Sequence, residues 1–287
     1  MDDKDWIILK TISEEKTISK AADRLYLSQP ALSNRLKNME REVGASIVLR
    51  TSNGVVFTPE GDHLLAYALD SLRRQTFVKE RIQNMGGAVY GTLQLGTSAV
   101  FAHCELPAIL QGFTALYPAV EISVKTGLSS KVTKMLQKEE ISVAVIRGDH
   151  FWPEKKHMLK SEHLCLASFS PIAFDDLPQR PRIHYGTDPS LRNMLHDWWH
   201  ETFACPPRIS MEVDSMDTCR QMVLHNLGWA ILPEAGLKEP HNLHTQNLYW
   251  RDQTPVLRPT WLLYRNWSAE LPAVNAFIRY LQDYYAP

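Results

Sequence analysis

A chain of 287 residues is long enough for about two domains and can bury a substantial core. Hydrophobic residues form 44% of the chain and charged residues 22%, which describes an ordinary soluble globular protein. The net charge is -1, and residues 1–85 carry 13 basic and 12 acidic side chains, so overall charge does not indicate nucleic-acid binding. Any contact with DNA must therefore come from a few locally placed cations and from backbone amides at helix starts.

Several classes of protein are excluded by what the sequence lacks. The four cysteines are far apart and form no C-x-x-C pair, so neither a disulfide framework nor a zinc ribbon is expected. The acidic N-terminus has no signal-peptide pattern, and no run approaches 18 apolar residues, so we expect a cytoplasmic protein with no membrane span. No nucleophile elbow, P-loop or dinucleotide fingerprint is present, so we expect neither an enzyme nor a bound cofactor.

The chain opens with a predicted helix at residues 5–14, and residues 17–50 then have the layout of a helix-turn-helix. Leu27 is expected to fill the gap between the two helices of the motif. Ser28 suits the N-cap of the second helix because its hydroxyl can accept a free backbone N–H. Pro30 is tolerated in the first turn, where a missing N–H donor does no harm.

The second helix of this motif has one apolar and one polar face. Leu32, Leu36 and Met39 recur at helical spacing and should point inward. Small and amide side chains can approach base edges in a major groove, while cations meet phosphates. An ordinary helical pair with a solvated face is the alternative interpretation. The outer face combines small, amide-bearing and cationic residues, namely Gln29, Pro30, Ser33, Asn34, Lys37 and Arg41.

A hairpin is predicted directly after the helix-turn-helix. The turn at residues 51–54 contains Asn53-Gly54 between two apolar runs, which is a strong hairpin signal. In this position the hairpin is interpreted as the wing of a winged helix. Arg50, at the base of the wing, is placed to reach a phosphate or the minor groove.

The first 65 residues closely resemble the DNA-binding domain of LysR-type transcriptional regulators. This resemblance implies a bacterial regulator that senses a small molecule while bound to double-stranded DNA as a homodimer or homotetramer. Two departures are visible, because Ile47-Val48 replaces the usual Leu-Phe pair and the second basic residue of the wing is missing. The matching residues are Ser19, Ala21, Ala22, Leu25, Ser28, Gln29, Pro30, Ala31, Ser33, Leu36, Glu40, Gly44, Arg50, Thr58 and Gly61. The DNA-contacting residues that follow from the motif and the resemblance are Ser19, Ser28, Gln29, Pro30, Ser33, Asn34, Lys37, Arg41, Arg50 and Asn53.

A long helix is expected to begin at Thr58-Pro59-Glu60, which offers a capping hydroxyl, a first-turn proline and an acid against the helix dipole. Its apolar positions follow steps of three and four residues, as in a coiled-coil seam. A monomeric surface helix is the alternative, whereas the resemblance implies that this helix pairs two subunits. The seam positions are Leu65, Ala68, Leu72, Gln75, Lys79 and Ile82.

From Tyr90 onward, short predicted strands alternate with helices, which indicates an α/β domain. In the family that the chain resembles, this part is a two-lobed effector domain related in fold to periplasmic binding proteins. The expected fold is therefore α/β, with an N-terminal winged helix-turn-helix, a dimerisation linker helix and a two-lobed effector-binding domain. The expected ranges are 1–58, 59–89 and 90–287, with lobe I at about 90–160 and 266–287 and lobe II at about 161–265.

A ligand is expected between the lobes, at the carboxyl ends of strands and the starts of helices, where a small anion or polar metabolite is favoured. Each hydroxyl in this set has an alternative role as an ordinary helix cap, and Ser129 or Ser130 is expected to cap the helix that runs to Glu139. For Arg147 the alternative is a surface or interlobe ion pair. The candidate effector-binding residues are Thr97, Ser98, Val100, Phe101, Thr126, Gly127, Ser129, Arg147 and Tyr185.

Two other possible sites carry less weight. His196 and His200 have a spacing that can ligate zinc, but no H-E-x-x-H motif is present, so no metal site is expected. Cys104, beside His103, could act as a redox sensor, although a buried structural cysteine is the favoured interpretation. The tryptophans of the second lobe are interpreted as core or interface residues.

The sequence thus predicts a LysR-type regulator that binds an interrupted palindrome and whose DNA binding or bending responds to an effector between the lobes. The alternative is a metabolite-binding protein whose helix-turn-helix mediates protein contacts.

Overall fold

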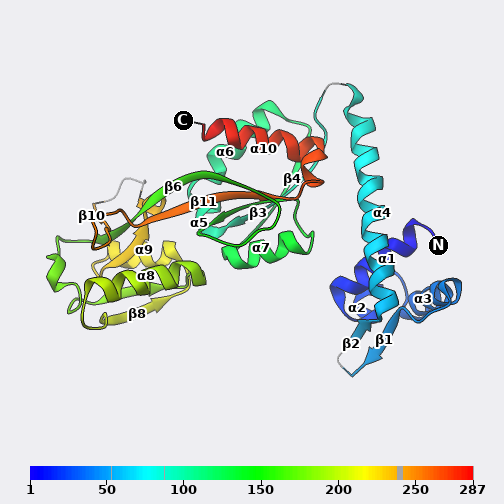
Figure 1. The fold of residues 1–287 in the computed structure, drawn as a ribbon, viewed down its shortest axis with the longest axis horizontal. Helices are drawn as coiled ribbons and strands as arrows, with labels where there is room; N and C mark the ends of the chain where they lie inside the picture. The colour runs from blue at the N-terminus through cyan, green and yellow to red at the C-terminus, as the bar shows by residue number, and fades with distance from the viewer. Residues whose placement is uncertain (53, 87, 238–241, 287) are drawn as a thin grey trace. The chain divides into compact units, whose positions relative to one another are not determined.

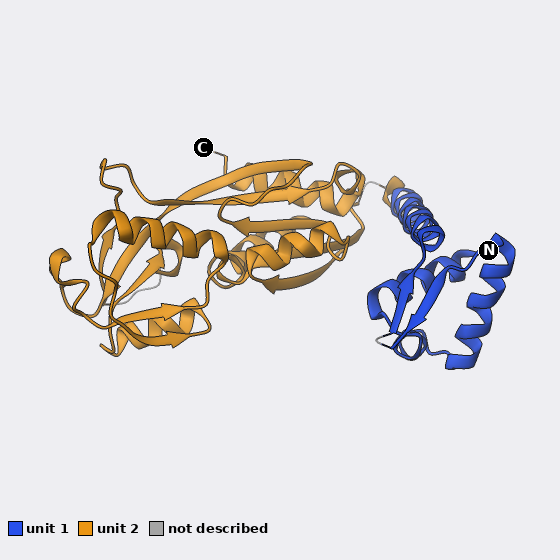
Figure 2. Cartoon of the chain, turned by 60° about the horizontal axis from the view of Figure 1, so that its bottom comes forward, with its two compact units in different colours: residues 1–83 blue, residues 84–287 orange. Residues whose placement is uncertain are grey.

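The computed structural model describes residues 1–52, 54–86, 88–237 and 242–286. The chain divides into two compact units, residues 1–83 and residues 84–287 (Figure 2). Among the helices of the described residues, none combines the length and apolar character needed to cross a membrane.

The first unit is a winged helix-turn-helix followed by a long helix, as the sequence predicts (Figure 1). Its core consists of apolar side chains from all four helices and the start of the wing, among them Leu9, Leu32 and Ile47, which are fully buried. Its elements are α1 (Asp3–Glu15), α2 (Ile18–Arg24), α3 (Gln29–Val43), β1 (Val48–Thr51), β2 (Gly54–Phe57) and α4 (Pro59–Gln83).

Local signals set the ends of these helices. The Ser28 hydroxyl accepts the Ala31 N–H at the start of α3, so the predicted cap is confirmed, and Gly44 ends that helix in a left-handed conformation. The Thr58 hydroxyl likewise accepts the Gly61 N–H at the start of α4. The prediction for Leu27 is wrong, because this side chain is exposed, whereas Leu25 packs against the core.

The wing is held against the helices by backbone and carboxylate hydrogen bonds. In the hairpin Val48 pairs with Phe57 and Thr51 with Gly54, whose φ of 129° favours glycine. One carboxylate oxygen of Glu40, on α3, accepts the Ile47 N–H at 2.9 Å and so fixes where the wing begins. Asn53, at the turn, lies outside the described residues.

Four of the six positions on α4 that are predicted to form a coiled-coil seam pack inside their own unit. Ala68 is fully buried, and Leu65 and Leu72 pack against the core of the winged helix. The Gln75 side-chain amide donates to a carboxylate oxygen of Asp3 on α1. Over this part of α4 the steps of three and four residues therefore reflect packing within the unit, whereas the last two predicted seam positions, Lys79 and Ile82, are exposed.

The second unit is built on one seven-stranded sheet, in the order β10-β6-β11-β5-β3-β4 with β9 also paired to β6, and on a separate β7-β8 pair. Strand β3 is parallel to β4 and β5, whereas β11 is antiparallel to both β5 and β6. The strands are β3 (Gly91–Ser98), β4 (Val120–Gly127), β5 (Val143–Arg147), β6 (Lys155–Ser168), β7 (Arg182–Tyr185), β8 (Ile209–Val213), β9 (Ala230–Pro233), β10 (His244–Asn247) and β11 (Leu257–Tyr264). The helices are α5 (Ala99–Cys104), α6 (Leu106–Leu116), α7 (Ser129–Gln137), α8 (Pro189–Thr202), α9 (Met216–Leu224) and α10 (Pro272–Tyr284).

Strands β6 and β11 run side by side from one lobe into the other (Figure 1). Lobe I comprises β3–β5, α5–α7, α10, the part of β11 beside β5 and the part of β6 that pairs with it. Lobe II comprises β7–β10, α8, α9 and the C-terminal part of β6. The sequence-based division put residues up to 265 in lobe II, whereas residues 260–264 pair with β5 in lobe I.

Each lobe has its own core. In lobe I, α7 covers one side of the sheet while α6 and α10 cover the other, where Phe113 and Phe277 meet edge to face (Figure 1). Lobe II is built around Trp198, Trp199 and Trp229, all of them buried, and the rings of Trp199 and Trp229 stack at 6.0 Å. These three tryptophans are therefore core residues, as predicted.

Candidate functional site

The outer face of α3 is exposed and polar along its length. Five of its predicted DNA-contacting residues are exposed and Ser33 is half-buried, because the apolar side of the helix faces the core of the unit. The exposed residues are Gln29, Pro30, Asn34, Lys37 and Arg41.

Arg50 connects the wing to this face. Its guanidinium donates to the Ser33 hydroxyl at 3.3 Å, so the base of the wing and the middle of α3 lie together. Ser19 is exposed on α2, while the exposed Ser28 uses its hydroxyl to cap α3. The structure thus brings α3 and the wing base into one continuous surface.

Some cations on this unit are engaged in ion pairs and are not free for phosphates. Arg35 is held by Asp2 and Asp5, each at 2.6 Å, and its charge is therefore directed toward α1. In the part of the chain that the structure describes, Lys37 and Arg41 have no ion-pair partner. Since overall charge is close to zero, these two cations and Arg50 dominate the electrostatics of the α3 surface.

In the second unit, the predicted effector residues meet at the carboxyl ends of parallel strands. Thr97 lies beside Thr126 in the pairing of β3 with β4, and Ser98 lies beside Gly127. Thr97 is fully buried, whereas Thr126 is exposed on the edge strand. The strand ends that the sequence singled out are therefore neighbours in the sheet.

The first strand end leads into α5, a short helix that the sequence pattern does not predict. The Ser98 hydroxyl accepts the Phe101 N–H at 3.4 Å, so it takes the capping role foreseen as its alternative. Phe101 is fully buried, and Val100 packs against the core of lobe II. These residues therefore form part of the contact between the lobes.

The prediction that a serine caps α7 is wrong. The N-cap residue is Leu128, whose side chain has no hydrogen-bonding group. The Ser129 hydroxyl instead accepts the Arg147 N–H at 3.0 Å, joining the start of α7 to the end of β5. The Ser130 N–H donates to a carboxylate oxygen of Asp188, which comes from lobe II, at 2.8 Å. A residue of the other lobe thus supplies the missing cap.

Arg147 forms a buried ion pair with Glu162 on β6, which is the alternative role foreseen for this arginine. Both side chains are almost wholly buried. Lys160 extends the cluster, since its ammonium lies 3.5 Å from Glu162 and 2.6 Å from Glu105. Burial, together with the charge of Arg258, lowers the pKa of Arg147 to about 10, so it remains a cation at neutral pH.

Tyr185 contributes to the same region from lobe II. It is almost fully buried in the core of that lobe, and burial raises the pKa of its phenol. Arg258, which pairs across strands with Glu162, donates to the backbone oxygen of Arg147 at 3.4 Å. Two guanidiniums therefore lie buried between the strands that connect the lobes.

Asp188, Glu162 and Arg258 are functional candidates that the sequence reading missed. Arg258 follows the apolar pair Val256-Leu257, and a charged residue there is an available signal, whereas Glu162 lies among polar neighbours that give none. Asp188 precedes Pro189 at the start of a predicted helix, which signals an ordinary cap. Its contact with α7 could not be read from that pattern.

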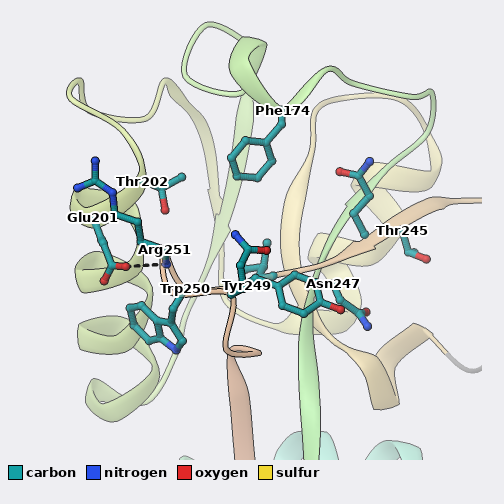
Figure 3. Close-up of a pocket in the computed structure, with 11 residues that line it drawn as sticks. Phe174, Glu201, Thr202, Thr245, Asn247, Tyr249, Trp250 and Arg251 are labelled. Atoms are coloured by element: carbon teal, nitrogen blue, oxygen red, sulfur yellow. Dashed lines mark hydrogen bonds between the residues drawn. The ribbon is translucent and has the colours of Figure 1, made fainter.

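A hollow of about 760 Å³ lies on lobe II, beside β10 and the end of α8 (Figure 3). Figure 3 shows Phe174 and Tyr249 on two sides of this hollow. Glu201 accepts the Arg251 N–H at 2.7 Å. Both charged lining residues, Glu201 and Arg251, are exposed. The hollow is therefore a shallow feature with mixed polarity, unlike the buried charges between the lobes.

The remaining candidates are placed as follows. The Nε2 atoms of His196 and His200 face each other at 3.0 Å on the exposed side of α8, and the described residues contain no group of three or more potential metal ligands. Burial raises the pKa of Cys165 to about 11 and that of Cys219 to about 12. Cys104 is half-buried and packs against the core of lobe II.

Comparison with known proteins identifies the family. A family model described as the bacterial regulatory helix-turn-helix protein of the lysR family matches residues 4–62, and one described as the LysR substrate binding domain matches residues 86–286. The chain is 41% identical over 282 residues to the uncharacterized HTH-type transcriptional regulator YraN of Bacillus subtilis (strain 168), and the match spans 98% of each.

Two full-length structures share the fold. A variant of OxyR from Pseudomonas aeruginosa matches with a TM-score of 0.70 and 19% identity, covering 98% of this chain and 95% of that one. CbnR complexed with its target DNA matches with a TM-score of 0.65 and 18% identity, covering 99% of each chain. Taken with the family models and the curated relative, these matches establish that the chain belongs to the LysR family of transcriptional regulators, whose members are DNA-binding proteins and not enzymes.

Proposed function

We propose that this regulator binds an interrupted palindrome in double-stranded DNA as a homodimer or homotetramer, and that a small anionic effector between the lobes alters its DNA binding or bending. The observation that carries the DNA part is the exposed polar face of α3, to which Arg50 is joined through Ser33. That CbnR has been solved in complex with its target DNA supports this part. Such a protein would act in the cytoplasm, where the DNA is.

Residues on the α3 surface divide by chemistry. Gln29 and Asn34 can donate to and accept from base edges, and the short side chains of Pro30 and Ser33 allow close approach to the groove. The cations Lys37, Arg41 and Arg50 suit phosphates, which fix position without reading sequence. Ser19, Ser28 and Asn53 complete the proposed contact set.

Dimerisation is proposed through the part of α4 that does not pack on its own unit. Val78 and Ile82 are 53% and 60% exposed and lie four residues apart, so they share one face of the helix. A second copy that covered these side chains would remove apolar surface from water. Two DNA-binding units joined in this way would meet two half-sites related by a two-fold axis.

The effector is proposed to be an anion because buried positive charge gathers where the lobes meet. Arg147 and Arg258 are both buried there, and the start of α7 adds the positive end of a helix dipole. Thr97, Ser98 and Thr126 supply hydroxyls at the adjoining strand ends. Val100, Phe101, Gly127, Ser129 and Tyr185 complete the proposed wall of the site.

A thermal-shift screen of the full chain against small carboxylates, amino acids and phosphates tests the effector proposal. A ligand at about 100 times its Kd stabilises a protein by roughly 2.7 kcal/mol, which is a shift of several degrees. We expect a stabilising compound to lose its effect in Thr97→Val and keep it in the control Thr114→Val, since Thr114 lies on the exposed side of α6. The same compound should change the DNA footprint, and a hit that leaves the footprint unchanged contradicts the proposal.

A further inference from the structure

The start of α7 has no cap within its own helix. Leu128 occupies the N-cap position without a side-chain hydrogen bond, and the Ser129 hydroxyl is engaged with the Arg147 N–H. Helix starts leave several backbone N–H groups without an acceptor and carry partial positive charge. The first turn of α7 therefore needs an acceptor, and an anion suits it best.

That acceptor is the carboxylate of Asp188, which belongs to lobe II. One oxygen, Oδ2, accepts the Ser130 N–H of α7 at 2.8 Å. The other, Oδ1, accepts the Ser190 N–H of its own helix, α8, at 3.1 Å. A single carboxylate thus caps two helices that belong to different lobes. An ordinary N-cap needs only the contact within its own helix, so the bond to α7 requires a separate explanation.

The surroundings of Asp188 favour an anion. The side chain is only 3% exposed, and the Nε2 atom of His150, from the loop after β5, lies 3.3 Å from Oδ1. Burial opposes ionisation of this carboxyl. The amide hydrogen bonds from Ser130 and Ser190 and the nearby His150 outweigh burial and hold the pKa of Asp188 below its ordinary range. Arg258, on β11, is also close enough for its charge to interact with Asp188.

Among the described arginine, lysine, aspartate and glutamate side chains of this cluster, positive and negative charges balance only when Asp188 is counted. The cations are Arg147, Arg258 and Lys160, and the carboxylates near them are Glu162, Glu105 and Asp188. Without Asp188 the cluster would hold one uncompensated positive charge in a buried place, which is strongly unfavourable. An external anion could restore the balance by occupying the same position.

We propose that Asp188 is an internal ligand for the anion-binding start of α7: it holds the two lobes together in the absence of effector, and an anionic effector must displace it. That Asp188 holds the two lobes together follows from the hydrogen bonds and burial alone. That an anionic effector displaces Asp188 rests on the proposed function of the interlobe site. A residue that competes with the effector would also select for effectors whose negative charge can replace a carboxylate at Ser130.

The claim that the Asp188 carboxylate links the two lobes can be tested without an effector, by removing this carboxylate and then supplying another one. In the full chain, Asp188→Ala removes the carboxylate and leaves a space of its size. Formate has the same carboxylate group, so we expect 100 mM sodium formate to raise the Tm of Asp188→Ala by several degrees over 100 mM sodium chloride. Wild-type protein should show equal Tm values in the two salts.

Asp252→Ala is the matched control. Asp252 also accepts a backbone N–H, from Thr254 at 2.9 Å, but it lies in an exposed loop of lobe II and contacts one lobe only. This variant should respond equally to formate and chloride. Equal Tm values for Asp188→Ala and wild type, or a formate response no larger than that of Asp252→Ala, would overturn the proposal.

Asp188→Asn provides a second test if the alanine variant fails to fold. Asparagine fills the same space but has one acceptor oxygen, so one of the two amides, at Ser130 or Ser190, must lose its partner. Hydrogen exchange should then be faster in a peptide covering residues 128–136 or 189–196, and unchanged exchange in both contradicts the proposal. Because neither test uses an effector, a failed effector screen with a positive formate result would refute only the proposed function of the site.

Discussion

Replacing Lys37 with glutamine should make DNA binding less sensitive to salt. Each phosphate that a cation neutralises contributes about -0.9 to the slope of log affinity against log salt. With Lys37, Arg41 and Arg50 from each of two DNA-binding units, the slope for the wild-type dimer should be about -5.4. Removing Lys37 from both units should change the slope to about -3.6. If the two proteins bind equally in 1 M salt, the variant should then bind roughly 60-fold more weakly than wild type in 0.1 M salt.

The assay is a fluorescence anisotropy titration of labelled operator DNA, selected beforehand from a random pool, at several KCl concentrations. Lys138→Gln is the matched control, because it makes the same change in net charge at an exposed position of the second unit. That variant should keep the wild-type slope. If Lys37→Gln also keeps it, or if both variants change equally, Lys37 does not meet a phosphate and the assignment of the α3 surface is wrong.

Three further results follow from the structure. Gly61→Ala should destabilise residues 1–83 by roughly 1–3 kcal/mol, measured by calorimetry, because a Cβ there would overlap the backbone oxygen of Ile47. Iodoacetamide should label the exposed Cys205 in native protein and spare Cys219, whose pKa burial raises to about 12, as mass spectrometry would show. The pKa of Asp188 is lowered by folding, so its stabilisation is present at neutral pH and lost below about pH 4. The Tm difference between wild type and Asp188→Asn should therefore narrow as pH falls from 7 to 3.

Local signals predicted most of the fold because they act within a few residues. Three such features depend only on residues that are neighbours in the sequence. They are the cap at Ser28, the end of α3 at Gly44 and the hairpin turn before Val55. Strand β6 shows where such signals end, since no local pattern in residues 155–158 predicts a strand, although the observed strand begins at Lys155. These residues are held as a strand by pairing with β11, which is about a hundred residues away in sequence.

The candidate site was less predictable, for two physical reasons. Steps of three and four residues on α4 describe any helix with one buried stripe, so the pattern could not separate packing against α1 from pairing with a second chain. At the start of α7, the serine pair at 129–130 is the best cap that the local sequence offers. In the structure, however, the carboxylate of Asp188 accepts the Ser130 N–H. A charged acceptor binds helix-start amides more strongly than a hydroxyl, and only the folded chain brings it there.

Selection of DNA sites from a random pool by wild-type protein and by Ser33→Glu tests the central claim most directly. Ser33 lies beside Arg50 on the α3 surface, so a carboxylate there would face the phosphates of bound DNA. We expect wild-type protein to enrich an interrupted palindrome, and Ser33→Glu to enrich no sequence while keeping the wild-type Tm and oligomeric state. Enrichment of the same palindrome by both proteins with equal affinity would contradict the assignment of α3 as the helix that reads DNA.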